Sequence, residues 1–454
     1  MPSYRGKFQY LSSSGSATQQ GACQVQFDNE KFNLTPESGS PLVFDLGDVD
    51  AVNAADYEIR LPLYTGNTVL LQQFGKSYQD LSRELIENYR KRTLECLLLE
   101  DLQEVDRFTG AFTLEPAAGQ PISGPAEIRL YKSNLAVLPD KSLAFQWRLA
   151  DVSSFRFDAQ NYEIILDRDG ERLRLNRLAK RTELLQTRLR EALDALRAQS
   201  ADALHAILPF LNADELQVVA GLLPEGHSAA AGKLAAVHPR IPEALAANAV
   251  DATLKPYYDE LLRRTSKGLL FAGFKMIRPE DDAAGNASGE NDAPASSGNA
   301  DDDKAHDEMP DVDSAGPQAL YWFFFPIARK DGSGAGNVVA WEASSASGRA
   351  TYFFRLVESG EEARLFNPAT AAASVERGIA RITRVLGMVS FRRRPIYLSD
   401  DELTGKIEFH RYAIAARRIA DLRVVRSAFL GRAIHSSVDA WRGQVDGILA
   451  KAGL

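Results

Sequence analysis

The sequence predicts an α+β protein with several domains. Its 454 residues are too many for one hydrophobic core. The stretch 21–92 recurs once further along the chain, and each copy changes from the period of a strand to the period of a helix near its end. The C-terminal half adds more alternating segments and several long helical ones. We therefore expect two tandem modules, each a small barrel or sandwich of strands that ends in a helix, followed by a helical connector and an α+β domain.

The repeat can be followed in the printed sequence. The Asp-Val pair at 48–49 returns at 151–152, and the Tyr-Glu-Ile run at 57–59 returns at 162–164. Self-similarity of this kind marks one structural unit that is used twice. The N-terminal half is therefore predicted to be a tandem repeat, although the repeat by itself indicates no chemistry.

Alternating apolar residues predict the strands of each copy. In the segment AEIRLY, Ile128 and Leu130 face one side of a strand and their charged neighbours face the other. Polar turn residues such as Asp169-Gly170 separate these segments. Each copy has about seven such segments, at the short spacing of a small barrel or sandwich.

Apolar residues at helical spacing then close each copy. Ser77 and Asp80 have the spacing of a capping box at the start of the first helix. The apolar stripes are Leu81, Leu85 and Tyr89 in the first copy and Leu185, Leu189, Leu193 and Leu196 in the second.

This order of elements resembles the pleckstrin-homology-like (PH-like) superfamily, over roughly residues 4–100 and 106–198. The resemblance implies a small barrel whose open end is plugged by the helix. It also implies a surface of strand edges, loops and a helix groove that binds proteins or peptides. Neither closing helix contains the Trp that many members carry, so the resemblance is to the fold and not to a subfamily. Two generic β-sandwich modules are the alternative.

The predicted domains follow from these patterns. Residues 1–105 and 106–198 form the two PH-like domains, 199–265 the helical connector, and 266–454 the α+β C-terminal domain. Within the last, residues 279–317 are rich in Asp, Gly, Ala, Ser, Asn and Pro and contain no aromatic side chain. Such a composition cannot bury enough apolar area to offset its conformational entropy, so we predict a disordered acidic insertion.

The net charge of −8 hides an uneven distribution. Between residues 280 and 313 the chain has twelve acidic residues and one basic residue. From residue 364 to the end it has sixteen Lys or Arg against eight Asp or Glu. A basic C-terminal part therefore follows an acidic tether.

Two arginine clusters are candidates for binding anions such as the phosphates of nucleic acid or of an anionic membrane. One precedes Pro395, and the other lies in a helix predicted over 400–430, together with Arg423 and Arg426. A solvated surface or an internal dock for the acidic insertion is the alternative, and in the latter case the insertion would cover the basic surface. The candidate residues are Arg392, Arg393, Arg394, Arg417 and Arg418.

No motif indicates an enzyme. Gly75-Lys76-Ser77 has the ending of a P-loop, but Leu70 stands where the leading Gly is needed. The glycine-rich stretch 332–336 leads into a strand instead of a helix. The chain has no Gly-x-Ser-x-Gly motif, and none of its six His has a second His at metal-binding spacing. We predict no catalytic residue, no cofactor and no metal site.

The remaining candidates for chemistry have structural explanations. Cys23 alternates with polar neighbours in a strand and is expected to be a small core residue. With Cys96 as the second cysteine, a disulfide framework is not expected. The run Asp48-Val49-Asp50 recurs as Asp151-Val152-Ser153, so we expect a conformational role at the start of a strand.

These observations favour a non-enzymatic adaptor or scaffold that binds protein partners through tandem PH-like modules, because two copies suit bivalent engagement. The first alternative is a binder of phosphate surfaces, nucleic acid or anionic membrane, that acts through the Arg-rich C-terminal domain and is regulated by the acidic insertion. Lipid binding through the repeats has less support, because their first strand turns hold few of the basic residues that phosphoinositide-binding relatives cluster there. The third hypothesis is an unrecognised enzyme in the C-terminal domain.

The start of the chain has no apolar run of signal-peptide length. No stretch approaches the ~18 apolar residues of a membrane span. We therefore expect a cytoplasmic protein without a transmembrane segment.

Overall fold

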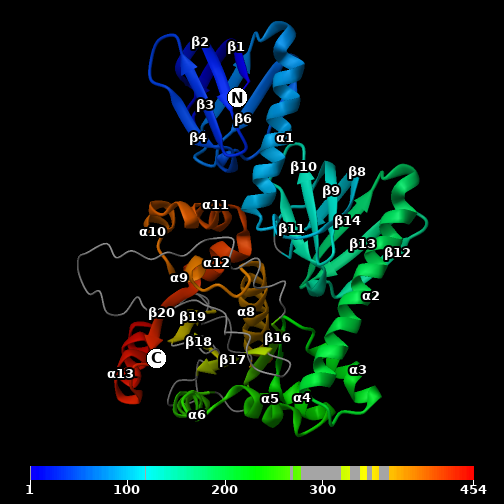
Figure 1. Cartoon of the computed structure of the whole chain (residues 1–454), viewed down its shortest axis with the longest axis vertical. Helices are drawn as coiled ribbons and strands as arrows, with labels where there is room; N and C mark the ends of the chain where they lie inside the picture. The colour runs from blue at the N-terminus through cyan, green and yellow to red at the C-terminus, as the bar shows by residue number, and fades with distance from the viewer. Residues whose placement is uncertain are drawn as a thin grey trace. The chain divides into compact units, whose positions relative to one another are not determined.

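The computed structural model describes residues 2–117, 119–265, 269–277, 319–327, 338–344, 350–356 and 368–454. The predicted acidic insertion at 279–317 and the glycine-rich stretch at 332–336 lie outside the described residues. The chain forms two compact units (Figure 1). Unit 1 comprises Met1–Ala192 and Thr404–Ile419, and unit 2 comprises Leu193–Leu403 and Ala420–Leu454. The predicted division into four domains stays a prediction.

The first module of unit 1 is a seven-stranded antiparallel sheet with the strand order β4-β3-β2-β1-β7-β6-β5 (Figure 1). A 3₁₀ turn, η1 (Leu46–Asp48), follows β4, and a second, η2 (Gly75–Ser77), leads into helix α1 (Tyr78–Cys96). The strands are β1 (Ser3–Leu11), β2 (Ala17–Phe27), β3 (Lys31–Pro36), β4 (Leu42–Asp45), β5 (Asn53–Ala55), β6 (Glu58–Pro62) and β7 (Thr68–Gln72).

The second module repeats this arrangement, with the strand order β11-β10-β9-β8-β14-β13-β12. Turn η3 (Leu149–Asp151) takes the place of η1, and η4 (Ala179–Arg181) leads into helix α2 (Thr182–Ile207). The strands are β8 (Glu104–Glu115), β9 (Ile122–Tyr131), β10 (Asn134–Pro139), β11 (Phe145–Arg148), β12 (Ser154–Asp158), β13 (Glu163–Arg168) and β14 (Glu171–Asn176).

The seven strands and the closing helix predicted for each copy are present. Among the described strands, no pairing joins the edge strands β4 and β5, or β11 and β12, so hydrogen bonds do not close either sheet into the predicted barrel. The alternating residues Ile128 and Leu130 are fully buried, and so are Leu81 and Leu85 of the first helical stripe. The predicted cap is absent, because η2 runs directly into α1 and the side chain of Ser77 makes no capping hydrogen bond.

Unit 2 contains a six-stranded antiparallel sheet in the order β15-β16-β17-β18-β19-β20. The sequence predicted the four central strands. The two outer strands come from segments predicted as helical, the connector and the C-terminal tail. The strands are β15 (Ser228–Ala230), β16 (Phe271–Met276), β17 (Ala319–Ile327), β18 (Val338–Ser344), β19 (Ala350–Arg355) and β20 (Phe429–Ile434).

Helices pack on both faces of this sheet. Phe323 and Phe325 of β17 join one core with residues of α5, α6 and α13, whereas Trp322 points to the other face and contacts Phe391 after α8. The helices are α3 (Ala213–Leu222), α4 (Ala231–Val237), α5 (Ile241–Ala249), α6 (Lys255–Arg264), α8 (Pro368–Met388), α9 (Arg394–Tyr397), α10 (Asp400–Gly405), α12 (Ala420–Ala428) and α13 (Val438–Lys451). No helix in the described ranges combines the length and apolar character needed to cross a membrane.

A buried polar network lies between β18, β19 and α13. The side chain of Glu342 is fully buried, and its Oε2 accepts a hydrogen bond of 2.5 Å from Thr351 Oγ1. His435 Nε2 lies 3.1 Å from the same oxygen, and Trp441 Nε1 donates to Thr351 Oγ1 at 3.0 Å. The ring of Tyr257 stacks on the His435 imidazole, with 4.0 Å between centroids. The buried carboxylate is therefore held directly by Thr351 and His435, and Trp441 of α13 supports Thr351.

The helix predicted over 400–430 is broken into several pieces. After α10 come turn η6 (Ile407–Phe409) and helix α11 (His410–Arg418), and Ile419 separates α11 from α12. The break at Ile419 is also the boundary between the units. Arg417 and Arg418 therefore belong to unit 1, whereas Arg423 belongs to unit 2.

Candidate functional site

An acidic turn on the first module is built around Asp45 and Arg92. Asp45 ends β4, and its Oδ1 accepts a hydrogen bond of 2.6 Å from the backbone nitrogen of Gly47 in η1. Arg92, from α1, donates to both carboxylate oxygens of Asp45, at 2.9 and 2.6 Å. Both side chains are buried. A bidentate pair of this kind has defined geometry, so it holds η1 in place against α1.

Helix α11 lies on this turn. Its two C-terminal arginines contact the turn directly: Arg417 Nη2 donates to the carboxylate of Asp48, and Arg418 Nε donates to the carbonyl oxygen of Gly47 at 2.7 Å. Arg418 Nη2 also donates to the carbonyl oxygen of Val49. The guanidinium of Arg417 lies 4.4 Å from the ring centroid of Tyr64. The turn thus offers a carboxylate and two carbonyls to two guanidinium groups, and Tyr64 adds an aromatic face.

An apolar contact brings the helix close to the turn. Ile414 of α11 is fully buried. A Cβ placed on Gly47 would lie 3.0 Å from Ile414 Cδ1 and 2.8 Å from Cys96 Sγ. The missing side chain at position 47 therefore creates the space that Ile414 occupies.

Burial alters the acid–base properties of the site. It raises the pKa of Asp48 above the ordinary value, because the loss of water outweighs the attraction of Arg417. Burial also raises the pKa of Asp50, against the opposing charge of Arg418, and raises the pKa of the Cys96 thiol to about 12. Within the described residues, the buried Nη1 of Arg418 has no hydrogen-bond partner. The charged groups of this contact are therefore incompletely compensated.

The second module lacks this set of residues. Turn η3 matches η1 in position, and it retains an acid at Asp151. However, Arg148 stands in place of Asp45, Ala150 in place of Gly47, and Ser153 in place of Asp50. The acidic turn and the space for an apolar side chain at position 47 are thus specific to the first module.

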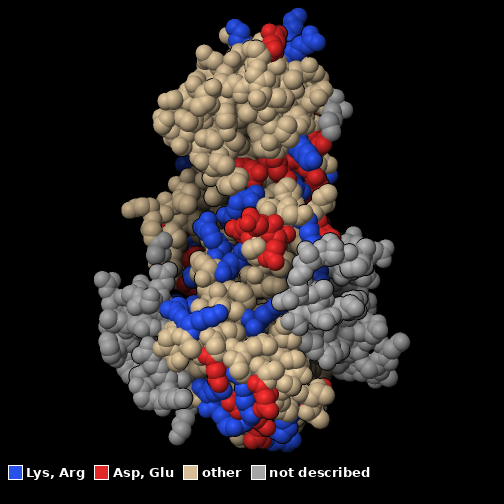
Figure 2. Space-filling model, turned by 90° about the vertical axis from the view of Figure 1, so that its left-hand side faces the viewer, with Lys and Arg blue, Asp and Glu red and all other residues tan. Residues whose placement is uncertain are grey.

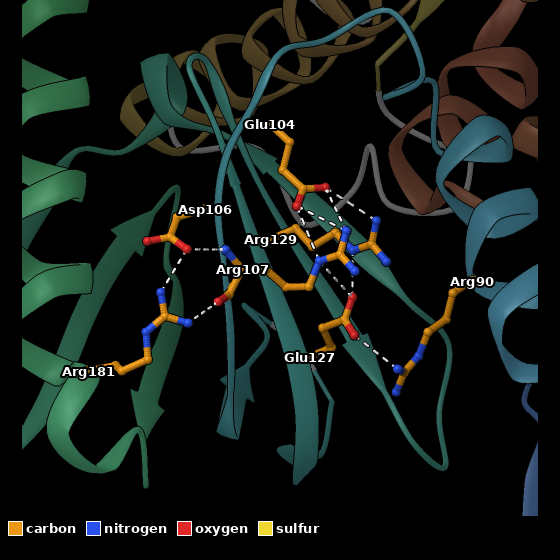
Figure 3. Close-up of polar contacts among 7 residues, drawn as sticks. All are labelled: Arg90, Glu104, Asp106, Arg107, Glu127, Arg129 and Arg181. Carbon is orange, nitrogen blue, oxygen red and sulfur yellow. Dashed lines mark hydrogen bonds and ion pairs between the residues drawn. The ribbon is translucent and has the colours of Figure 1, made fainter. Parts of the chain in front are cut away.

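A ladder of charged side chains ties α1 to the second module (Figure 3). Arg90 of α1 pairs with Glu127 of β9 at 2.9 Å. Glu127 also pairs with Arg129 at 2.6 Å, and Arg129 reaches Glu104 of β8 at 3.3 Å. Helix α1 therefore contacts three parts of unit 1: the core of the first sheet, the acidic turn through Arg92, and the second sheet through Arg90.

One face of the first module carries few charged side chains. Figure 2 shows a broad, mostly uncharged surface on one side of the molecule. In this module, residues 8–27, from β1 into β2, contain no Asp, Glu, Lys or Arg. This stretch therefore offers no basic side chain to a phosphate group, whereas its polar and apolar side chains can contact a protein.

The other predicted cluster, Arg392 to Arg394, lies in unit 2 at the junction of α8 and α9. The guanidinium of Arg393 lies 5.8 Å from the ring centroid of Trp341 and 5.6 Å from that of Tyr352. The five predicted arginines are thus divided between the two units. Phosphate binding by any of them stays a prediction.

Sequence reasoning missed the acidic residues that receive Arg417 and Arg418. It assigned Asp48 a conformational role, and it did not identify Asp45 or Arg92. One signal was available, because Gly47 and Asp50 are not repeated in the second copy although Leu46, Asp48 and Val49 are. In the described part of the chain, no three His, Cys, Asp or Glu side chains group closely enough to hold a metal ion.

Comparisons with known proteins identify no family for this chain. No protein-family model and no curated protein matches it. Among solved structures, it is similar to the N-terminally truncated linker-DH/PH domains of p115-RhoGEF, at 11% sequence identity and a TM-score of 0.17. This similarity covers 26% of this chain and 46% of that chain, so the chain spans about half the length of the structure it matches. So low a TM-score carries no argument about fold or function.

Proposed function

We propose that this protein is a non-enzymatic adaptor that binds other proteins through two N-terminal PH-like modules. Support comes from two antiparallel sheets with identical strand order, each followed by a helix after its seventh strand. The PH-like resemblance implies protein or peptide binding, and that step is an analogy from fold. Two modules in one chain suit bivalent engagement, which raises avidity without new contacts.

The observation that carries this proposal is the contact between the first module and helix α11. The helix is separated from the module by most of unit 2 in the sequence, yet it binds the module through Arg417, Arg418 and Ile414. A surface that recognises a helix by two guanidinium groups and one apolar side chain has the properties of a protein-binding site. Residues 8–27 of the same module contain no Lys or Arg, the side chains with which proteins attract phosphate, and this favours protein partners.

The two modules differ at the corresponding turn, so they are suited to different partners. The first has acidic groups at positions 45, 48 and 50, whereas the second has Arg148 and Ser153 at two of these positions. Opposite charges at matched positions discriminate between partners by repulsion as well as attraction. An adaptor that joins two unlike proteins follows from this difference.

The test is affinity capture of the intact tagged chain, with chemical cross-linking before a high-salt wash. We expect a protein partner at constant stoichiometry, cross-linked to residues 2–117 or 119–192. Nucleic acid and lipid are quantified in the same eluate. Recovery of either, with loss as salt rises, would replace the proposal with the phosphate-surface alternative at the Arg-rich C-terminal part. A chain that is recovered alone at every salt concentration would overturn the adaptor proposal.

A further inference from the structure

We infer that the acidic turn of the first module is a binding site for a basic helix of a partner protein, and that α11 occupies this site as an internal ligand. The inference rests on the proposed adaptor function and names the partner class for one of its sites. The recognised element is a short helix with an apolar residue followed three and four positions later by two arginines, the arrangement of Ile414, Arg417 and Arg418.

The site selects this pattern by its chemistry. Residues spaced three and four apart lie on one face of a helix, so the apolar side chain and both guanidinium groups reach the turn together. Asp48 supplies a carboxylate, and the carbonyl oxygens of Gly47 and Val49 accept from a single planar guanidinium. A lysine ammonium is a compact charge and cannot match this forked geometry. Arginine is therefore required at the position of Arg418, whereas the position of Arg417 requires a cation that reaches Asp48.

The contact made by α11 is suited to exchange. The helix has nine residues, and a helix of that length is marginal on its own, so its structure depends on docking. The buried Nη1 of Arg418 lacks a hydrogen-bond partner within the described residues. Burial of Asp48 raises its pKa in spite of the nearby Arg417, so the docked pair keeps a desolvation cost. A partner helix whose own arginine has an acceptor for the corresponding nitrogen binds the same turn more favourably.

Covalent attachment gives α11 an advantage over any free helix. A tethered ligand competes at an effective concentration on the order of millimolar. External helices are therefore excluded from the wild-type site unless they bind tightly or α11 is weakened. This predicts a masked site that becomes measurable when the internal arginines are removed.

The experiment measures binding of a fluorescently labelled peptide of residues 404–419 to the full-length chain by anisotropy. The chain carrying Arg417→Ala and Arg418→Ala is expected to bind the peptide about tenfold or more tightly than wild type, because the internal competitor is weakened. Arg423→Ala, which removes an exposed arginine of α12 just beyond the docked helix, is the matched control and should leave binding at the wild-type level. A peptide with alanine at both arginine positions should not bind.

Adding Asp48→Ala to the double variant should abolish the gain in peptide affinity. Amide hydrogen exchange checks that the first sheet is intact while residues 410–418 exchange faster. If the double alanine variant also loosens the sheet, Arg417→Lys with Arg418→Lys provides the milder weakening. Equal peptide binding by wild type and by a variant with faster exchange at 410–418 overturns the inference, as does a gain that persists with Asp48→Ala. These results concern the helix site only, whereas a chain captured without partners would refute the adaptor function while peptide binding still held.

Discussion

Ile414 packs directly over Gly47, with no room for a side chain between them. A Cβ on Gly47 would approach Cys96 Sγ to 2.8 Å, Asp45 Oδ1 to 2.9 Å and Ile414 Cδ1 to 3.0 Å. Gly47 is not among the glycines with positive φ. Space, and not backbone freedom, is therefore the reason for glycine at this position.

Gly47→Ala is expected to displace α11 and to destabilise unit 1 by about 1–3 kcal/mol, the usual cost of overpacking. The measurement is amide hydrogen exchange over residues 410–418, which should become faster. Gly443→Ala is the control: this glycine lies inside α13 with nothing within 4 Å of a new Cβ, so alanine should stabilise its helix by about 0.5–1 kcal/mol. Unchanged exchange of α11 in Gly47→Ala would contradict the packing described.

Arg92→Met should be the most damaging change at the acidic turn. It removes the partner of a buried carboxylate and should cost about 3–5 kcal/mol of stability in the first module. Removing the charge of Asp45 as well, in the pair Asp45→Asn with Arg92→Met, should restore part of that loss because the buried carboxylate at position 45 is then gone. The stability of the single and the double variant is measured from the denaturant dependence of amide hydrogen exchange in β1 and β2. A double variant that is less stable than Arg92→Met would show that the turn needs Asp45 for more than the ion pair.

Thr351→Val should destabilise unit 2 by about 2–4 kcal/mol. The change leaves the shape but removes the hydroxyl that donates to Glu342 and accepts from Trp441, so two buried polar groups lose a partner. Thr351→Ser keeps the hydroxyl and should cost about 1 kcal/mol, for one lost methyl group. Thermal unfolding followed by tryptophan fluorescence compares the two variants. Equal losses would mean that the methyl group, and not the hydrogen bonds, matters.

The contribution of Asp50 to the stability of the first module should increase as the pH falls into the acidic range. Asp50 has a raised pKa in the folded chain, because burial disfavours its charged form more than Arg418 favours it. The folded state therefore binds the proton more tightly than the unfolded state does. The resulting gain is complete below the ordinary pKa of 3.8 and is lost as the pH rises through the raised value. The expected observation is a difference between wild type and Asp50→Asn in the pH dependence of exchange in α1. The same pH dependence of exchange in wild type and in Asp50→Asn would contradict this prediction.

Local patterns in the sequence were sufficient for the two repeated sheets. The alternation around Ile128 and the stripe that includes Leu85 depend only on neighbouring residues, and both segments form the predicted elements. Strand β15 has three residues, too few for a period to be visible, and its pairing with β16 depends on residues more than forty positions away. Short edge strands of this kind are determined by the sheet that they join.

The contact between α11 and the acidic turn was not predicted from the sequence. The sequence marked Arg417 and Arg418 as candidates for binding phosphate, which stays a prediction, whereas the structure shows them against Asp48 and the carbonyl oxygens of Gly47 and Val49. Arg417 and Asp48 are 369 positions apart, and no local pattern connects them. The boundary at Ile419 was equally hidden, because the apolar spacing continues across it from α11 into α12.

During synthesis, the first module is complete before helix α11 has been made. Segment Thr404–Ile419 is translated only after most of unit 2, whereas domains generally fold from the N-terminus as they leave the ribosome. The nascent first module therefore emerges with its acidic turn bare. During translation, a basic helix from another chain could therefore bind this turn without competition from α11. In the finished protein the same helix has to displace α11.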